Sequence, residues 1–196
     1  MSQPNAWTLL TPADGQPHVI AHRGASGYAP ENTVAAFLRA VDLGISAVET
    51  DVHQTRDGVI VTLHDPTLDR TTTGTGPVSD ADWSEVQALD AGSWYDPGFH
   101  REKVPDLDAY LACLAGRAIP VIEVKGGDTV VEQLAERFTS RDGGAFFFSF
   151  KAKEIQRLKA KCPNCPALYL AEWTEEERPC PSSEAYLARE MGMDAV

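Results

Sequence analysis

Two hydrophobic periods alternate along this chain. Short runs rich in β-branched and aromatic residues predict strands, and they occur at residues 18–24, twice within 47–65, and at 119–125, 145–150, 167–170 and 193–196. Segments with apolar residues three and four positions apart predict helices, and they occur at residues 31–43, 79–91, 105–115, 128–139, 152–161 and 183–191. Because strand and helix alternate, we expect an α/β fold with a parallel sheet and helices packed outside it.

Residues with capping chemistry mark the ends of several predicted helices. Asn32 or Thr33 is expected to cap the first helix, and Gly44 is expected to end it. Ser79 and Asp128 are the expected caps of two later helices.

The stretch 47–65, AVETDVHQTRDGVIVTLHD, carries the first candidate chemistry. Side chains alternate across a strand, so Glu49 and Asp51 share one face, and a turn at residues 56–58 would bring His64 about level with them. Two neighbouring buried carboxylates repel unless one takes a proton or a cation lies between them. The pattern therefore favours a divalent metal ion with a histidine in reach. The alternative is that both carboxylates lie at a solvated strand end.

Charged residues also occur at two other predicted strand ends. His22 and Arg23 follow the first apolar run, and Glu123 and Lys125 share one face of the strand at 119–125. In folds of this class, charged residues at the carboxyl ends of several strands indicate the active site.

Composition and charge narrow the classes of partner. The 196 residues are enough for one domain, with 43% hydrophobic and 23% charged residues. A net charge of −12 without a basic tract argues against binding of nucleic acid or of an anionic membrane surface. An anionic substrate would need a local cluster of metal ion, arginine and lysine. We also expect no transmembrane segment and no signal peptide, and hence a cytoplasmic location.

The four cysteines do not define a site. Cys162 and Cys165 have the spacing of a redox pair or of half a zinc site. No histidine lies beyond His100, and the pair follows a predicted helix instead of opening one. We therefore favour adventitious thiols around a loop for this pair; the other two cysteines are Cys113 and Cys180.

Several short motifs occur in a fixed order with fixed intervals. They are His22-Arg23-Gly24, Pro30-Glu-Asn-Thr33, Glu49-x-Asp51, Thr55-x-Asp57-Gly58, Leu63-His64-Asp65, Leu68-Asp-Arg-Thr-Thr72 and Glu123-x-Lys125. Together they resemble the glycerophosphodiester phosphodiesterases, from about residue 18 to at least residue 170. The resemblance implies a TIM (β/α)8 barrel as a single domain over residues 1–196, incomplete at its C-terminal end in this chain. It also implies a small insertion after the third strand, at residues 66–104.

The resemblance also assigns roles to residues. Glu49, Asp51 and Glu123 correspond to the metal ligands of the family, and their oxygen atoms suit one hard cation, Mg²⁺ or Ca²⁺. His22 and His64 correspond to a pair of general base and general acid.

Three further positions correspond to substrate contacts. Arg23 and Lys125 match phosphate-binding residues, and Phe150 resembles a position whose ring lies near the glycerol moiety. The implied reaction is hydrolysis of glycerophosphodiesters, such as glycerophosphocholine or glycerophosphoethanolamine, to sn-glycerol 3-phosphate and an alcohol. In this family the substrate's own 2-hydroxyl is thought to attack the phosphorus, and water then opens the resulting cyclic phosphate.

Other interpretations remain open. Because the chain ends before such a barrel would close, we expect unpaired strand edges and self-association through them. A catalytically silent fragment that binds phosphate or metal is one alternative. A phospholipase D-like enzyme acting on lysophospholipids is another, and it would need a longer apolar groove near Trp94. His53 shares the face of Glu49 and Asp51 by parity. Glu31 and Asn32 could touch substrate, but entry into the first helix explains Asn32, which is expected to be structural.

Overall fold

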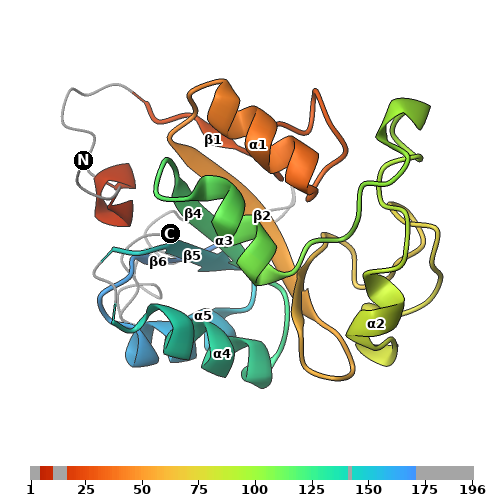
Figure 1. Cartoon of the computed structure of the whole chain (residues 1–196). Helices are drawn as coiled ribbons and strands as arrows, with labels where there is room; N and C mark the ends of the chain where they lie inside the picture. The colour runs from red at the N-terminus through yellow and green to blue at the C-terminus, as the bar shows by residue number, and fades with distance from the viewer. Residues whose placement is uncertain (1–4, 11–16, 141–142, 171–196) are drawn as a thin grey trace, which may run out of the picture.

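The computed structural model describes residues 5–10, 17–140 and 143–170 (Figure 1). The strands are β1 (Ile20–Ala21), β2 (Ala47–Gln54), β3 (Ile60–Thr62), β4 (Ile119–Val124), β5 (Phe146–Ser149) and β6 (Ala167–Tyr169). The α-helices are α1 (Val34–Asp42), α2 (Trp83–Val86), α3 (Leu107–Leu114), α4 (Asp128–Phe138) and α5 (Ala152–Lys161). Short 3₁₀ helices are η1 (Ala6–Leu9), η2 (Val78–Asp80) and η3 (Pro97–Phe99).

The strands form one six-stranded sheet whose parallel series runs β1-β2-β4-β5-β6. Strand β3 pairs antiparallel with β2 and lies outside this series, so it is the return arm of a hairpin. Each parallel neighbour in the series is reached through a connection that includes a helix, except that the link from β2 to β4 also contains β3 and residues 66–104. The alternation read from the sequence therefore yields the expected parallel α/β sheet. In the described part of the chain, β1 and β6 stand at opposite ends of this order and the sheet does not close.

The main core lies between the helices and one face of the sheet. Its members on the strands are residues such as Val48, Val52 and Ile122, which alternate with residues of the other face. The other face carries Ala47 and Val121 in a smaller apolar cluster that η1 covers. By the same alternation, the carboxylates of β2 and β4 project from this second face, away from α1, α3, α4 and α5.

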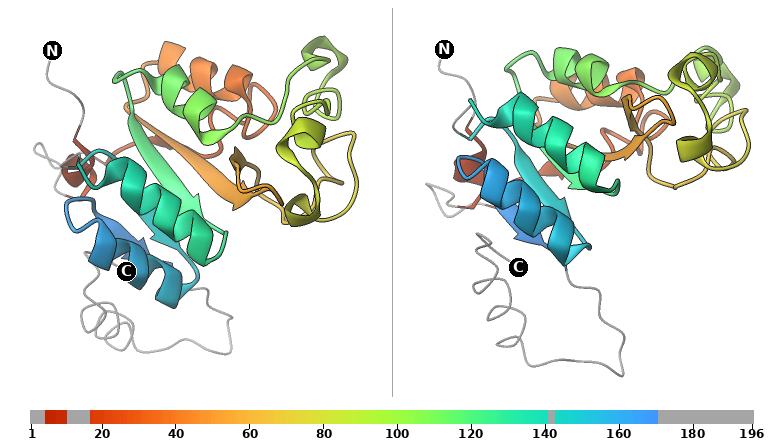
Figure 2. Two further views of the ribbon diagram at one scale, coloured as in Figure 1. Left: turned by 60° about the horizontal axis from the view of Figure 1, so that its bottom comes forward. Right: turned by 90° about the horizontal axis from the view of Figure 1, so that it is seen from below.

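Residues 66–104 lie beyond the carboxyl end of β2, at the opposite end of the sheet from η1 (Figures 1 and 2). This segment has a small apolar cluster of its own, formed with the hairpin by Val61, Leu63, Leu68, Val78, Val86, Ala91 and Val104. It contains no strand of the sheet, and its assignment as an inserted unit stays a prediction. Its position places it beside the end of the sheet where the charged residues gather.

The helix ends confirm some predicted caps and correct others. The Thr33 hydroxyl accepts the Ala36 N–H at the start of α1, and Gly44 follows its end with φ of +76°. Ser79 is not a cap, because it lies within η2, and Asp82 caps the shorter helix α2 through a capping box with Glu85.

Asp128 is also not a cap. It is the first residue of α4, and Gly127 occupies the cap position with extended backbone. Its carboxylate lies near the helix N-terminus, where negative charge is favourable, and pairs with Arg157 of α5.

Two predicted elements, the helix at 183–191 and the strand at 193–196, lie outside the described residues, as does Cys180. Among the described residues, no helix has both the length and the apolar character needed to cross a membrane.

Tyr110 of α3 links β2 to β4. Its hydroxyl donates to the Val48 carbonyl at 2.7 Å and accepts the Val121 N–H at 3.2 Å. The side chain is 0% exposed, so this hydroxyl satisfies two buried backbone groups in the strands that carry the carboxylates.

Replacing Tyr110→Phe is expected to lower the free energy of unfolding by about 1–3 kcal/mol, because it leaves a buried carbonyl and a buried N–H without their partner. Urea denaturation followed by circular dichroism measures this loss. Tyr95→Phe is the matched control, since Tyr95 is 36% exposed, and it should change stability by no more than about 0.5 kcal/mol. Equal losses in both variants would contradict the bridging role of Tyr110.

Candidate active site

Three carboxylates from two adjacent strands converge on the second face of the sheet. Asp51 of β2 is the register partner of Glu123 of β4, and Glu49 lies two residues before Asp51 on the same face. One oxygen from each side chain lies within 4.8 Å of the others, and the three residues are 3%, 0% and 8% exposed for Glu49, Asp51 and Glu123. The convergence expected from the sequence is present, and the alternative of a solvated strand end is wrong for these residues.

The electrostatics of this acidic cluster favour a cation. Burial, and then the charge of Asp51, raise the pKa of Glu49 to about 8. Burial also raises the pKa of Glu123. Glu49 Oε1 and Asp51 Oδ1 are buried without a hydrogen-bond partner in the described chain. Ligand oxygens about 2.3–2.6 Å from a Ca²⁺ ion, or somewhat less from Mg²⁺, can span the distances seen here, so the donor set fits a hard divalent ion.

Two basic side chains border the acidic cluster. Lys125 Nζ lies 2.7 Å from Glu123 Oε1 and 3.3 Å from Asp51 Oδ1. Arg23 Nε lies 3.5 Å from Asp51 Oδ2, and the Arg23 backbone N–H donates to Glu49 Oε2 at 2.6 Å. Arg23 adopts a left-handed backbone with φ of +55°, which is uncommon for a residue with a side chain and points to a conformation held by its surroundings. With all three carboxylates ionised, the two basic side chains balance two of the three negative charges.

The two candidate histidines lie beside the acidic cluster in different cavities. His22 and Glu49 line a cavity of about 340 Å³ whose other walls are apolar, including Val121 and Phe148. Burial, and then the charge of Arg23, lower the pKa of His22. The charge of His64 also acts on His22 in the same direction, so the two rings belong to one electrostatic site.

The second cavity, of about 370 Å³, is lined by His64, Glu123, Lys125 and Phe150. Leu63, which precedes His64, donates its N–H to the Asp51 carbonyl at 3.0 Å, so the hairpin does bring His64 level with the carboxylates. Phe150 is 47% exposed at the rim. Each candidate site residue from the sequence therefore lies in the acidic cluster, in one of its two flanking cavities or, in the case of Arg23, in contact with the cluster.

His53 also borders the second cavity, as its parity suggested. Its Nε2 lies 3.1 Å from the carbonyl oxygen of His64 and can donate to it, and burial lowers the pKa of His53. A neutral ring that supports the backbone of His64 is consistent with this position.

Comparison with known proteins gives the family of the chain. The Glycerophosphoryl diester phosphodiesterase family profile matches residues 22–196. The chain belongs to this family. A glycerophosphodiester phosphodiesterase of Caldanaerobacter subterraneus is 42% identical over 120 residues, which are 61% of this chain and 49% of that protein.

Two solved structures resemble this family member closely. The crystal structure of glycerophosphodiester phosphodiesterase from Agrobacterium tumefaciens is 42% identical with a TM-score of 0.72, and the match covers 78% of this chain and 66% of that one. An Oleispira antarctica phosphodiesterase, solved in complex with the product sn-glycerol-3-phosphate, is 30% identical with a TM-score of 0.78 over 90% of this chain and 72% of that one. These matches confirm the predicted α/β barrel class, of which the described sheet is an open part. The chain spans between 49% and 65% of the length of four curated relatives that it matches.

In this family member, Asn32 positions the metal-ligand candidate Asp51. Its side-chain N–H donates to Asp51 Oδ2 at 2.9 Å, and its side-chain oxygen accepts the Thr50 hydroxyl at 2.8 Å. Asn32 is buried with φ of +55°, a conformation that asparagine tolerates better than most residues. The interpretation of Asn32 as a purely structural helix-entry residue is therefore incomplete, because Thr33 alone caps α1. The sequence did contain a signal for this role: Asn32 directly precedes Thr33, which is sufficient to cap the helix, so the asparagine was available for another contact.

A chain of charged side chains connects His64 to Arg23. Asp65 Oδ1 accepts from His64 Nδ1 at 2.7 Å, and Arg70 binds Asp65 through Nε at 2.6 Å. Arg70 also donates to both oxygens of Glu31 at 3.0 and 2.7 Å, and Glu31 Oε1 accepts from Arg23 at 3.0 Å. Sequence reasoning missed this connection, since directly contacting members are up to 39 positions apart.

The Arg70 contacts predict a pH-dependent contribution to stability. The hydrogen bond from Arg70 is the largest cause of the lowered pKa of Asp65. For Glu31, burial raises the pKa, but the hydrogen bond and the charge of Arg70 outweigh burial, so the pKa of Glu31 is also lowered. A carboxylate with a lowered folded-state pKa stabilises the fold above its ordinary pKa, and the contribution is lost as pH falls toward the lowered value. We expect Arg70→Met to cost about 1 kcal/mol at pH 7, given the partly exposed groups, and clearly less at about pH 3.

Urea unfolding of Arg70→Met and of the unsubstituted chain at both pH values measures this difference. The control is Arg39→Met, because Arg39 lies over the ring of Tyr28 at 5.3 Å and its loss should cost the same at both pH values. A cost of Arg70→Met that does not change with pH would contradict the linkage.

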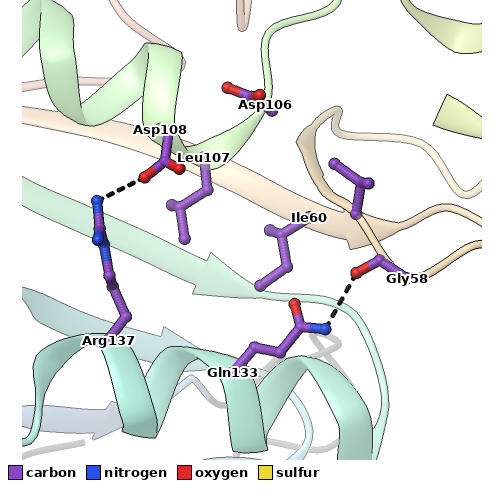
Figure 3. A pocket seen from close by; sticks show the side chains of 8 residues that line it. Gly58, Ile60, Asp106, Leu107, Asp108, Gln133 and Arg137 are labelled. Atoms are coloured by element: carbon purple, nitrogen blue, oxygen red, sulfur yellow. Dashed lines mark hydrogen bonds and ion pairs between the residues drawn. The ribbon is translucent and has the colours of Figure 1, made fainter. Parts of the chain in front are cut away.

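A further hollow, of about 270 Å³, lies away from the candidate site (Figure 3). It is bounded by the hairpin turn, the start of α3 and the side of α4. Gln133 donates to the Gly58 carbonyl at 3.0 Å, and Arg137 pairs with Asp108 across it. Its polar side chains thus join α4 to the hairpin and to α3, and it holds no residue of the acidic cluster.

The cysteines of the described chain lie in the apolar core. Cys113, Cys162 and Cys165 are buried. Among the described residues, the group suited to hold a metal ion contains no cysteine. The favoured interpretation of Cys162 and Cys165, adventitious thiols around a loop, remains a prediction.

Proposed function

We propose that this chain hydrolyses glycerophosphodiesters in a metal-dependent reaction that releases sn-glycerol 3-phosphate and an alcohol. The observation that carries the proposal is the buried cluster of Glu49, Asp51 and Glu123, whose carboxylate oxygens lie within 4.8 Å of one another beside two cations and two histidines. Glycerophosphocholine and glycerophosphoethanolamine are substrates of the proposed class. The relative solved with sn-glycerol-3-phosphate as its product supports this choice.

Glu49, Asp51 and Glu123 would hold one divalent cation, Mg²⁺ or Ca²⁺, through oxygen ligands. When bound, such an ion supplies positive charge that polarises the phosphate and offsets charge developing on its oxygens. Asn32 keeps Asp51 in place by donating a hydrogen bond to Asp51 Oδ2. The raised pKa of Glu49 means that this side chain must lose a proton to act as a ligand at neutral pH.

Arg23 and Lys125 would bind the phosphate oxygens. A net charge of −12 repels an anionic substrate at long range, so attraction must come from these local charges. Lys125 lines the second cavity and is 18% exposed at its side chain, which leaves its ammonium group accessible from that cavity. Phe150 at the rim of the same cavity would pack against the glycerol moiety.

The two histidines would transfer protons. His22 has a lowered pKa and is neutral at pH 7, as a general base must be. We assign it the removal of the proton from the attacking hydroxyl, which by family resemblance is the 2-hydroxyl of the glycerol. His64 would protonate the leaving alcohol: Asp65 accepts at Nδ1, which leaves Nε2 to face the substrate and balances positive charge on the ring.

The test is an assay of the purified chain with glycerophosphocholine and added Mg²⁺ or Ca²⁺, with release of choline and of sn-glycerol 3-phosphate both measured. We expect both products in equal amounts. Lysophosphatidylcholine in a parallel assay separates a phospholipase D-like activity, which would release choline from it. A folded, metal-binding chain without turnover of either substrate would instead establish the silent fragment and overturn the proposal.

Self-association is a second part of the proposal. The sheet order of the described residues ends with β1 and β6, and sheet edges can pair with another chain. Sedimentation equilibrium is expected to show a mass above 21.3 kDa that decreases on dilution. A monomeric mass at all concentrations would contradict it.

A further inference from the structure

We propose that Arg70 and Glu31 form a positioning bridge that holds the general acid His64 and the phosphate-binding Arg23 in place together. The inference rests on the proposed function, because it concerns how residues of that reaction are oriented. Glu31 contacts Arg23 directly, and Arg70 reaches His64 and Arg23 only through Asp65 and Glu31. Neither residue needs to touch the substrate. They are therefore positioning residues.

The guanidinium of Arg70 uses its planar fork on two carboxylates at once. Nε and one terminal nitrogen contact the two oxygens of Asp65 at 2.6 and 3.1 Å. The terminal nitrogens contact the two oxygens of Glu31 at 3.0 and 2.7 Å. Bidentate pairs of this kind fix orientation as well as distance.

Each carboxylate then holds one residue of the site. Asp65 Oδ1 accepts from His64 Nδ1 at 2.7 Å, which fixes the ring and its tautomer. Glu31 Oε1 accepts from Arg23 at 3.0 Å, while Arg23 also reaches Asp51. The bridge thus connects the β1–α1 loop, the end of the hairpin and the segment 66–104.

The surroundings distinguish this bridge from an ordinary surface ion pair. The side chains of Glu31 and Asp65 are only 14% and 27% exposed. The Arg70 side chain is itself 43% exposed, and its neighbours in sequence Leu68 and Thr71 are buried. By contrast, Arg56 pairs with Asp82 at 2.7 Å with both side chains well exposed, at 57% and 39%, and such a pair contributes little.

Loss of the Arg70 charge should act on His64 in a defined direction. Several charged and titratable groups of the described chain surround His64. They are Asp65 and Arg70 in its own segment, Glu31 of the β1–α1 loop, His53 of β2, Glu123 and Lys125 at the end of β4, Lys151 after β5 and His22 after β1. Of these, removal of Arg70 takes away one positive charge and leaves the Asp65 carboxylate unbalanced. Both changes favour the protonated ring, so His64 should titrate at higher pH.

The experiment compares Arg70→Met and Arg70→Lys with Arg56→Met as the matched control, all as full-length chains with saturating metal. We expect Arg70→Met to lower kcat on glycerophosphocholine about 10- to 100-fold, as for other partners that orient a site residue, and to shift the alkaline limb of the pH profile upward. Arg70→Lys keeps the positive charge but loses the planar guanidinium that contacts both carboxylates. It should therefore show the pH profile of the unsubstituted chain but only part of its kcat. Arg56→Met should leave both unchanged.

A histidine-resolved NMR titration provides a readout that does not need turnover. In Arg70→Met the His64 ring should titrate at higher pH than in the unsubstituted chain, and in Arg56→Met it should not move. If the ring titration and kcat are the same in Arg70→Met as in the control, the positioning bridge is wrong. If the unsubstituted chain shows no turnover while the His64 titration still moves, the proposed function fails and the bridge stands.

Discussion

Removal of divalent metal ions is expected to abolish hydrolysis of glycerophosphocholine by this chain. Asp51→Asn is expected to lower kcat/KM by about 10²-fold or more. The reason is that a metal ion supplies several kcal/mol of charge stabilisation in such sites, and each 1.36 kcal/mol is tenfold in rate. Asp51 is the fully buried member of the acidic cluster. Treatment with a chelator, followed by titration with Mg²⁺ and then Ca²⁺, measures the loss and the recovery. Glu132→Gln, in an exposed acid of α4 that pairs with Lys161, is the control and should retain full activity. Turnover that survives the chelator would overturn the metal-dependent mechanism.

The same site predicts how metal changes stability with pH. The folded-state pKa of Glu49 is raised to about 8, so ionisation of Glu49 between its ordinary pKa and 8 is unfavourable in the folded chain. The metal-free protein should therefore lose stability as pH rises from 6 to 8, and saturating metal should remove that loss. Thermal unfolding at both pH values, with and without the ion, measures it.

Substitution of either histidine is expected to reduce turnover strongly while leaving the fold intact. A proton transfer by a positioned imidazole contributes about 10²–10⁴ in rate, so His22→Ala and His64→Ala should each lose this factor on glycerophosphocholine with added metal. Because the pKa of His22 is lowered by burial, the acidic limb of the kcat/KM profile should lie below about pH 6.5, the ordinary histidine value, and should disappear in His22→Ala.

His100→Ala is the control for these variants, because His100 is exposed and contacts only its own turn through the Pro97 carbonyl in the described chain. It should retain full activity. Near-full activity in His22→Ala or in His64→Ala would show that the assignment of base and acid is wrong.

The carboxylates could be predicted because their positions follow from a single period. Glu49 and Asp51 are two residues apart on a strand, and a second strand, ending in Glu123-x-Lys125, has to lie in the same parallel sheet. The hairpin turn then places His64 at about the same height along the sheet as these carboxylates. These inferences need only the alternation of side chains and the convergence of parallel strand ends.

The remaining contacts depend on packing between segments that no local pattern specifies. Glu31 and Arg70 meet across 39 positions, and either could equally have been a solvated surface charge. Asn32 was explained by a nearby helix start that Thr33 in fact caps. Ser79 failed as a cap for a similar reason: Asp82, three residues later, offers a carboxylate and a capping box, and local propensity does not choose between such neighbours.

The pairing of Asp51 with Glu123 in register has a consequence for ion choice. Backbone hydrogen bonds hold neighbouring strands about 4.7–4.9 Å apart. This spacing sets where the two side chains begin and does not depend on the side chains themselves. Asp51 has a short side chain that is also hydrogen-bonded to Asn32, so it is the least adjustable carboxylate of the acidic cluster. For a bound cation, we therefore expect the choice between a small and a large ion to depend on Glu49 and Glu123, because their extra methylene group lets their carboxylates move closer or farther away.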